Sequence, residues 1–274
     1  MQIKGELRKM PVHLNHDNLV EYQLLFYHTN QKTELSVLAN DFIGSQITFK
    51  FTGNIYCISC GIKTVSSFNQ GFCYNCFKNS PESAECIIRP ELCRAHEGIG
   101  RDVAWEQINH NQPHIVYLAA TDAIKVGITR KSNIPARWID QGASEAIILA
   151  ETPNRYEAGI IEVALKSTFV DKTNWRTMLT NQIDTSIDLE SKKWELEEIL
   201  PSDISQYISD EDQLTPINYP VIQFPEKVSS VNLEKQPEIT GKLMGIKGQY
   251  FLFENGKVMN IRRHTGYEVE FIVE

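Results

Sequence analysis

Six cysteines are the residues of this chain whose types and spacing point most directly to chemistry. Four of them form two C-x2-C pairs, Cys57 with Cys60 and Cys73 with Cys76, and twelve residues separate the pairs. Two cysteines spaced in this way place their thiolates on one side of a tight turn, and two such turns close a tetrahedral zinc site. Four protein ligands leave no open coordination position, so the sequence predicts a structural zinc ribbon.

A second set of potential metal ligands follows the ribbon. Cys86, Cys93 and His96 have the spacing C-x6-C-x2-H, which supplies three local ligands. His110 is the candidate for the fourth ligand, and His114 is the second choice. These ligands would form a second closed zinc site. The alternative is a single zinc ion in the chain, with two buried thiols and ordinary polar histidines here, and the spacing leaves both open.

The elements that could position further chemistry lie between His114 and Asn174. The residue pattern predicts, in chain order, a strand over 115–119, a strand over 123–128, a helix from Pro135 to Gly142, a strand over 146–149 and a helix over 155–169. The first two strands are joined by a few residues and should form a hairpin. Proline in the first turn and glycine at the end are typical boundaries of the first helix.

This order of strands and helices resembles that of the GIY-YIG nucleases, especially their short phage-type members. The matching residues are Tyr117, Gly127 within KVGIT, Arg137 and Glu162, whereas Lys125 stands where the family has its second tyrosine. The resemblance implies a tyrosine that acts as a base or positions water, an arginine that clamps phosphate and a glutamate that binds Mg²⁺. Here these roles would fall on Tyr117, Arg137 and Glu162. Lys125 would either replace catalysis with phosphate binding or take over phosphate positioning.

Helical geometry permits this use of Glu162. On the second predicted helix the apolar face is formed by Ala158, Ile161, Leu165 and Phe169. Glu162 lies at the border of that face, from which a carboxylate can point into a groove. Basic and polar residues nearby are candidates for contacts with nucleic acid: Arg130, Lys131, Arg137, Asn174 and Arg176. Alternatively, Tyr117 is an ordinary core residue and Arg137 simply pairs with Glu162.

A second resemblance covers the whole chain. The strings PELCRAHEG, PHIVYLA, KVGITR, RWIDQGA and DKTNWR together resemble an uncharacterised bacterial family of about this length. That family is described only as a domain of unknown function, so the resemblance implies no activity.

The formal net charge of −8 does not exclude nucleic acid as a partner, because the acidic excess is local. It lies mainly between Asp184 and Asp212, around a helix predicted over 189–200, and we interpret that run as a solvated face. Both chain ends are rich in predicted strands. The C-terminal strands either form a small barrel that could bind nucleic acid or complete the N-terminal sheet, and the second alternative is favoured slightly.

The sequence therefore predicts an α+β fold with β-rich ends, a zinc-ribbon insertion and a GIY-YIG-like centre. The expected segments are 1–56 (N-terminal β segment), 57–110 (zinc-binding region), 111–181 (GIY-YIG-like domain), 182–226 (acidic helix and linker) and 227–274 (C-terminal β segment). No apolar run is long enough to span a membrane and no secretory signal is recognisable, so a cytoplasmic location is expected.

The predicted function is nucleic-acid binding, with Mg²⁺-dependent phosphodiester cleavage as its enzymatic form. The alternative is a catalytically inactive, zinc-stabilised adaptor for a protein or RNA partner. A small-molecule enzyme is a third hypothesis, although the sequence contains no phosphate-binding loop, dinucleotide fingerprint or catalytic triad.

Overall fold

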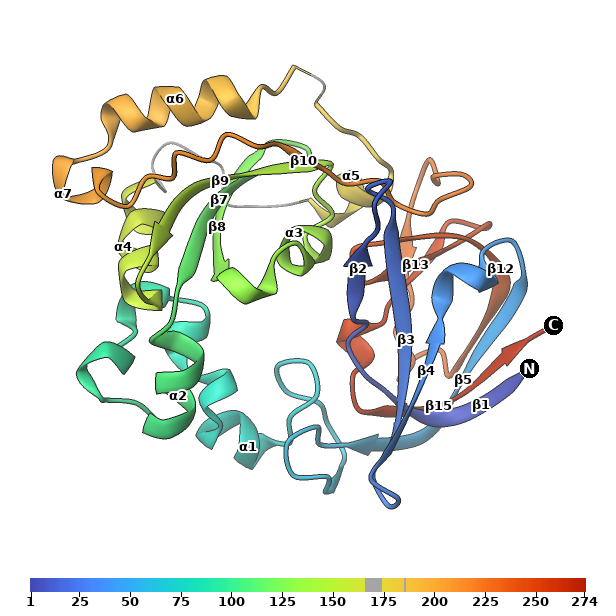
Figure 1. The fold of residues 1–274 in the computed structure, drawn as a ribbon. Coiled ribbons are helices and arrows are strands. Elements are labelled where there is room, and N and C mark those ends of the chain that lie inside the picture. Colours follow the sequence, from blue (N-terminus) through green and yellow to red (C-terminus); the bar gives the residue numbers. More distant parts are fainter. Residues whose placement is uncertain (166–173, 185) are drawn as a thin grey trace. The chain divides into compact units, whose positions relative to one another are not determined.

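The computed structural model describes residues 1–165, 174–184 and 186–274, and it divides into two compact units (Figure 1). Unit 1 comprises residues 1–78, 179–181 and 218–274, and unit 2 comprises residues 79–178 and 182–217. The chain thus leaves unit 1 after the ribbon and returns to it for its last strands. The fold class is α+β, as predicted. Among the described helices, none is both long and apolar enough to cross a membrane.

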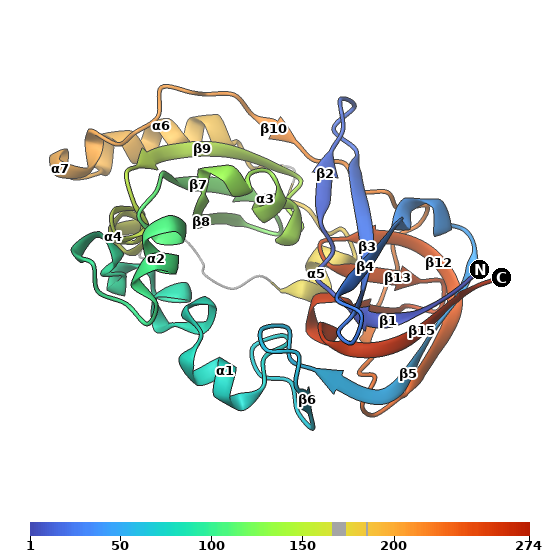
Figure 2. The ribbon, with the colours of Figure 1, turned by 60° about the horizontal axis from the view of Figure 1, so that its bottom comes forward.

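Unit 1 is built on a curled sheet of eleven strands (Figure 2). Its elements are β1 Gln2–Leu7, β2 Val12–Leu14, β3 Val20–His28, β4 Thr33–Leu38, β5 Gln46–Tyr56, β6 Lys63–Thr64, α1 Tyr74–Asn79, whose last residue belongs to unit 2, β11 Ser229–Ser230, β12 Glu238–Lys247, β13 Tyr250–Phe253, β14 Lys257–Asn260 and β15 Tyr267–Val273. The sheet order is β11-β14-β13-β12-β5-β15-β1-β3-β2, with β4 paired to β3 and β6 paired to β5. The C-terminal strands therefore complete the N-terminal sheet, which was the favoured alternative.

Alternating side chains supply the core of unit 1. In β3, Val20, Tyr22, Leu24 and Phe26 are buried and the residues between them are partly exposed, as expected for a strand with one face on a core. Phe49 of β5 pairs with Phe271 of β15, and their ring centroids are 4.8 Å apart. These aromatic contacts join strands that are more than two hundred residues apart in the sequence.

One lysine of unit 1 is buried. Lys247 is 1% exposed, its Nζ donates a hydrogen bond to Asn181 Oδ1 at 2.8 Å, and it lies 5.0 Å from the centroid of the Tyr219 ring. Burial lowers the pKa of Lys247 to about 8 because the charged form loses hydration. At neutral pH the buried ammonium group therefore lowers the stability of the folded state.

Replacement of Lys247 by methionine is expected to raise the free energy of unfolding at pH 7 by about 1–3 kcal/mol. The folded chain releases this proton near pH 8, whereas the unfolded chain holds it up to the ordinary pKa of 10.5, so wild-type stability should rise with pH between these values. Urea unfolding at pH 7 and at pH 9.5 tests this. The advantage of the variant should shrink at the higher pH, and Lys242→Met, at an exposed position of the same strand, is the control. An equal advantage at both pH values would contradict the lowered pKa.

Unit 2 is built on a four-stranded sheet with the order β10-β9-β7-β8. Its elements are α2 Val103–His110, β7 His114–Ala120, β8 Ile124–Arg130, α3 Ala136–Asp140, β9 Glu145–Thr152, α4 Arg155–Leu165, α5 Trp175–Leu179, whose last residue belongs to unit 1, α6 Leu189–Ile199, α7 Ser202–Ser205 and β10 Thr215–Pro216. The five elements predicted for 115–169 occur in the expected order, and the end of the last helix beyond residue 165 lies outside the described residues. In the described part of the chain, β8 is an edge strand of this sheet.

The two faces of this sheet are covered differently. Val116 and Leu118 of β7 pack with residues of α4 and α6 such as Ile161 and Leu196 in one apolar cluster. Tyr117 points to the other face because strand residues alternate, and there it meets Trp138 of α3 at 6.0 Å between ring centroids. Figure 1 shows α6 and α3 on opposite sides of this sheet.

The acidic helix α6 lies where it was predicted, but its charged residues are not all solvated. Lys193 is fully buried, and its Nζ donates hydrogen bonds to Ser209 O at 2.6 Å, Glu211 O at 2.9 Å and Asp212 Oδ1 at 2.7 Å. The described acidic residues of this run are exposed or partly exposed, as interpreted, and the buried charge is that of Lys193. This lysine holds the chain after α7 against the helix, because it satisfies two backbone carbonyls and one carboxylate at once.

Candidate metal centres and a candidate catalytic site

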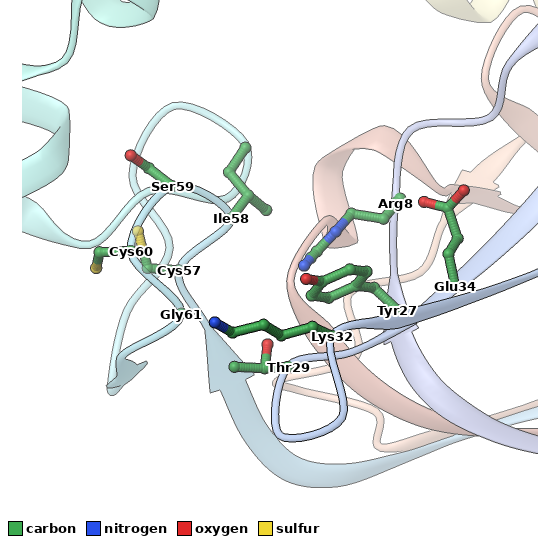
Figure 3. Close-up of a pocket in the computed structure, with 10 residues that line it drawn as sticks. All are labelled: Arg8, Tyr27, Thr29, Lys32, Glu34, Cys57, Ile58, Ser59, Cys60 and Gly61. Carbon is green, nitrogen blue, oxygen red and sulfur yellow. The ribbon is translucent and has the colours of Figure 1, made fainter.

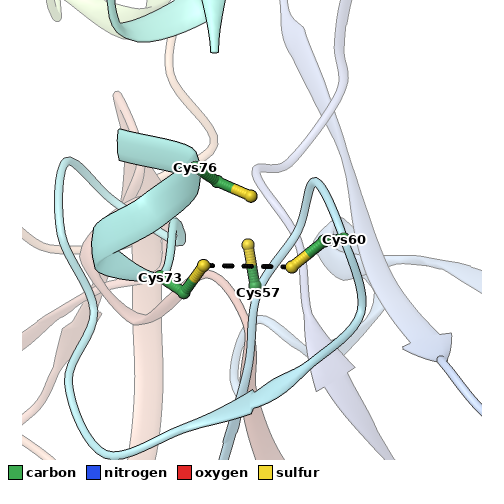
Figure 4. A group of neighbouring side chains, drawn as sticks. All are labelled: Cys57, Cys60, Cys73 and Cys76. Atoms are coloured by element: carbon green, nitrogen blue, oxygen red, sulfur yellow. Dashed lines mark hydrogen bonds between the residues drawn. The ribbon is translucent and has the colours of Figure 1, made fainter. Parts of the chain in front are cut away.

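The four cysteines of the predicted ribbon converge on one point in unit 1 (Figure 4). Cys57 and Cys60 lie in the turn after β5, Cys73 immediately precedes α1, and Cys76 lies within α1. Their sulfur atoms all lie within 4.8 Å of one another, and Cys60 Sγ is 3.9 Å from Cys73 Sγ. A tetrahedral zinc ion with Zn–S bonds of about 2.3 Å holds its sulfurs roughly 3.8 Å apart. The cluster therefore has a geometry that could hold a zinc ion.

Backbone amides around the first knuckle stabilise a thiolate. Burial raises the pKa of Cys57, but hydrogen bonds from the N–H groups of Cys73, Cys60 and Ser59 outweigh it and bring the pKa to about 7. Gly61 follows with φ of +73°, a conformation that favours glycine and lets the turn close. These N–H···S hydrogen bonds favour the thiolate form of Cys57, which is the form that binds a metal ion.

The aromatic residues of the ribbon pack mainly on one another. Phe72 is buried, and the Phe68 ring lies 5.5 Å from Tyr74 and 5.9 Å from Phe77 between centroids. This cluster is small and half-exposed, so it cannot stabilise the ribbon without a further cross-link.

A cavity of about 410 Å³ opens beside the first knuckle within unit 1 (Figure 3). Arg8 and Tyr27 line one side of it, with the Arg8 guanidinium 4.6 Å from the centroid of the Tyr27 ring, and Lys32 points toward the knuckle. Arg8 also pairs with Glu6 at 3.2 Å, and its Nη1 is buried without a hydrogen-bond partner among the described residues. A buried donor without a protein partner can bind a small acceptor group or an ordered water molecule.

A second group of ligand atoms is buried in unit 2. His110 Nδ1 lies 3.9 Å from Cys86 Sγ and 3.7 Å from Cys93 Sγ. A tetrahedral zinc ion with Zn–S bonds of about 2.3 Å and a Zn–N bond of about 2.05 Å separates sulfur from nitrogen by roughly 3.6 Å. His110 therefore lies with these two cysteines, and the group is compatible with zinc.

The other predicted ligand of this centre lies outside the group in the structure. The His96 ring stacks on Tyr156 with 4.7 Å between centroids, and His96 Nε2 lies 3.7 Å from Glu97 Oε1. His114, the second choice, is also not among these ligand atoms, and its Nδ1 lies 2.7 Å from Gln112 O. Among the described residues, the group thus has three ligands in mutual contact.

Tyr117, Arg137 and Glu162 belong to β7, α3 and α4, and their charges influence one another. Burial raises the pKa of the Tyr117 phenol and the charge of Glu162 adds to this, whereas Arg137 acts in the opposite direction. Burial alone would lower the pKa of Arg137, but Tyr117, Asp140 and Glu162 outweigh it and raise it. Each of the three residues is thus within electrostatic reach of the others.

Gly127 and Gln141 fix the position of the phenol. Tyr117 is opposite Gly127 in the hairpin, and a Cβ at Gly127 would lie 2.5 Å from the phenol oxygen, so the ring needs glycine below it. The Tyr117 hydroxyl donates a hydrogen bond to Gln141 Oε1 at 2.8 Å. Tyr117 is therefore a neutral, fully buried donor at physiological pH.

Arg155 links this site to the second metal group. Burial lowers the pKa of its guanidinium, while negative charge on Cys86, Cys93 and Glu162 acts in the opposite direction. Glu162 therefore lies near two guanidinium groups, those of Arg137 and Arg155. Their combined positive charge can attract an anionic substrate.

The remaining predicted site residues are placed as follows. Lys125 is buried and, by strand alternation, shares a face of β8 with Gly127. Arg130 Nη1 donates to Asn109 Oδ1 at 2.6 Å, and Lys131 Nζ lies 2.7 Å from Glu151 Oε2. Asn174 Oδ1 accepts a hydrogen bond from the Arg176 N–H at 3.1 Å, and the Arg176 guanidinium lies 4.4 Å from the centroid of the Trp175 ring. A role of these residues in nucleic-acid binding remains a prediction.

A sequence model of the family described as "Protein of unknown function (DUF2797)" matches residues 44–269. The match includes both cysteine groups and the Tyr117 site. The chain belongs to this family. The resemblance to an uncharacterised family is thereby confirmed, and its description names no activity. Comparisons of this DUF2797 protein with curated proteins and with solved structures gave no match.

The predicted site residues of this DUF2797 protein did not include Gln141, which holds the phenol, or Arg155, which lies near Glu162. They also did not include Gly159 of α4, where a Cβ would meet the backbone of Pro90 and Glu91. The spacing of Arg155, Gly159 and Glu162 at i, i+4 and i+7 was a usable signal, because it places them on one face of a helix. No local pattern indicates the hydrogen bond between Tyr117 and Gln141.

Proposed function

We propose that this DUF2797 protein binds nucleic acid and cleaves a phosphodiester bond at the site formed by Tyr117, Arg137 and Glu162. The observation that carries the proposal is the convergence of a phenol, a guanidinium and a carboxylate from three separate elements. A phosphodiester reaction needs a group that orders the nucleophile, a cation at the phosphate and a carboxylate for a divalent metal, and this set contains one of each.

The roles follow from the surroundings of each side chain. Arg137 keeps its charge because anionic neighbours stabilise it, so it can hold a phosphate oxygen. Tyr117 keeps its proton because burial raises its pKa, so it orders the nucleophile through its hydroxyl, and Gln141 holds that hydroxyl in place. Lys125, where the GIY-YIG nucleases have a second tyrosine, adds positive charge on the Tyr117 face.

Glu162 is the residue that would hold Mg²⁺. A single carboxylate suits this ion, which keeps most of its water shell and takes further ligands from the substrate phosphate. When bound, Mg²⁺ would neutralise charge that develops on the phosphate. The Cys57–Cys76 ribbon is assigned a structural role, because four thiolate ligands leave no place for a substrate.

Replacement of Tyr117 by phenylalanine is expected to slow cleavage about 100-fold, because the ring still packs over Gly127 while the hydroxyl is lost. The test incubates the full chain with labelled single-stranded, duplex and branched DNA and with RNA, in the presence of Mg²⁺. Tyr207→Phe, at a half-buried tyrosine elsewhere in unit 2, is the matched control. Cleavage at the wild-type rate in Tyr117→Phe would remove Tyr117 from the mechanism.

A specific observation favours the alternative of an inactive adaptor. Tyr117 is fully buried and Lys125 is 6% exposed, so a substrate cannot reach these two side chains in this conformation. If none of the nucleic acids is cleaved with Mg²⁺ or Mn²⁺, the hypothesis of an inactive adaptor is favoured. Binding of a labelled nucleic acid without cleavage would then assign the protein as a binding module.

A further inference from the structure

The loop that carries Cys86 and Cys93 is attached directly to helix α4. Arg155, the first residue of α4, donates hydrogen bonds from Nε to Cys86 O and from Nη2 to Ile87 O, both at 2.9 Å. Both acceptors are backbone carbonyls of the loop. A guanidinium group that binds two carbonyls in this way fixes the direction of the helix as well as its distance from the loop.

Gly159 brings the same loop into contact with the next turn of α4. A Cβ at this position would lie 2.4 Å from Glu91 N and 2.5 Å from Pro90 C, so the loop backbone rests on the helix only because residue 159 has no side chain. Glu162 follows three residues later on the same face, about 4.5 Å further along the helix axis. The loop therefore holds α4 immediately before its candidate catalytic residue.

The ribbon of this chain indicates where the fourth ligand of the second centre comes from. In the Cys57 knuckle, the sulfur accepts a hydrogen bond from the N–H two residues later, and the residue after that, Cys60, is the next ligand. Cys93 repeats this pattern, because its sulfur accepts a hydrogen bond from the Ala95 N–H. The equivalent ligand position is then His96, whose ring now lies on Tyr156 at the edge of the loop.

We propose that Cys86, Cys93, His96 and His110 form a second, closed zinc centre whose role is to hold α4 so that Glu162 faces Tyr117 and Arg137. The zinc centre and the contacts of Arg155 and Gly159 stand on their own, whereas the catalytic use of Glu162 rests on the proposed function. Arg155 and Gly159 are positioning residues in this arrangement, and they do not contact the substrate.

The loop needs a metal to perform this role. It consists of short 3-10 turns, and in the described chain its buried cluster contains only four residues: Ala84, Cys86, Cys93 and Ala95. So small a core cannot hold a loop in one conformation, whereas a closed zinc site adds several kcal/mol of local stability. A shift of α4 by about 1 Å can cost 100-fold in catalysis, because the reacting groups must meet at fixed distances.

The test compares the full-length wild type with Cys93→Ser, Gly159→Ala and His96→Ala, and uses Arg94→Lys as the control on the exposed side of the loop. We expect two zinc ions per chain in the wild type, one in Cys93→Ser, and at least ten-fold weaker retention of the second ion against a chelator in His96→Ala. In Cys93→Ser and Gly159→Ala, amide hydrogen exchange in residues 155–165 should become at least ten-fold faster, and cleavage should fall about 100-fold in kcat with little change in KM. Arg94→Lys should match the wild type.

Each result bears on a separate step. Two zinc ions in Cys93→Ser, or unchanged retention in His96→Ala, would overturn the assigned ligands. Loss of the second zinc with unchanged exchange in α4, or unchanged exchange in Gly159→Ala, would overturn the positioning role. Faster exchange in both variants of a protein that cleaves no nucleic acid would support the positioning of α4 and reject the proposed function.

Discussion

Glutamine in place of Glu162 is expected to reduce the rate of phosphodiester cleavage by about 1,000-fold, while the Kd for nucleic acid stays the same or falls. The change preserves the shape of the side chain and removes its charge, so any loss reports on the carboxylate itself. A metal ligand contributes several kcal/mol to the transition state, and each 1.36 kcal/mol corresponds to a factor of ten in rate. Binding should not weaken, because the loss of a negative charge beside two guanidinium groups favours an anionic ligand.

The matched control for this change lies on the same helix. Glu157 is in the first turn of α4, and it is not among the main charges that shift the pKa values of Tyr117, Arg137 or Arg155. Glu157→Gln should therefore cleave at the wild-type rate. Single-turnover cleavage at saturating enzyme separates the chemical step from binding. A rate within three-fold of wild type for Glu162→Gln would show that this carboxylate holds no catalytic metal.

The hypothesis that Tyr117, Arg137 and Glu162 form one site came from the order of the elements and one tight hairpin. The pattern from Ile115 to Ile128 predicts two adjacent strands, and their register then places Tyr117 opposite Gly127. Helical periodicity put Glu162 at the border of the apolar face, and half-burial of that residue agrees with it. The partner of the phenol was not predictable, because Gln141 reaches it only as a result of where α3 ends.

In the metal groups too, contacts within one turn were predictable from the sequence, whereas contacts between distant residues were not. Cys57 and Cys60 are brought together by one turn, so their spacing alone predicts a shared ligand site. His96 has suitable spacing from Cys93, but its ring stacks on Tyr156, sixty residues later in the chain. Ligand spacing cannot predict a contact between residues so far apart.

The large sheet was the least predictable part of the fold. β1, β2 and β4 were not identified as separate strands. The pairing of β15 with β1 and β5 joins opposite ends of the chain, so its register depends on the shared core and not on a local turn. Alternation of apolar and polar residues shows that a strand has one buried face, but it does not show which strand pairs with it.

Serine at Cys73 is expected to remove one zinc ion per chain and to unfold the ribbon, residues 57–78, without unfolding the sheet of unit 1. Structural zinc sites of small modules contribute on the order of 10 kcal/mol of apparent binding energy, and the ribbon has little else to hold it. Its aromatic cluster is half-exposed, whereas the sheet has its own core around Phe49 and Phe271. Loss of the zinc ion should therefore unfold residues 57–78 and leave the sheet folded.

Three measurements distinguish local from global loss. Zinc analysis should fall by one ion per chain, limited proteolysis should cut between residues 57 and 78, and the thermal midpoint of the remaining protein should move by only a few degrees. Val65→Ala is the control, because Val65 lies in the same segment and is 95% exposed. If Cys73→Ser keeps all its zinc, the four sulfur atoms do not form a metal site, in spite of their separation of less than 4.8 Å. If the whole of unit 1 unfolds instead, the ribbon is part of the folding core, and its zinc supports the sheet as well as the knuckles.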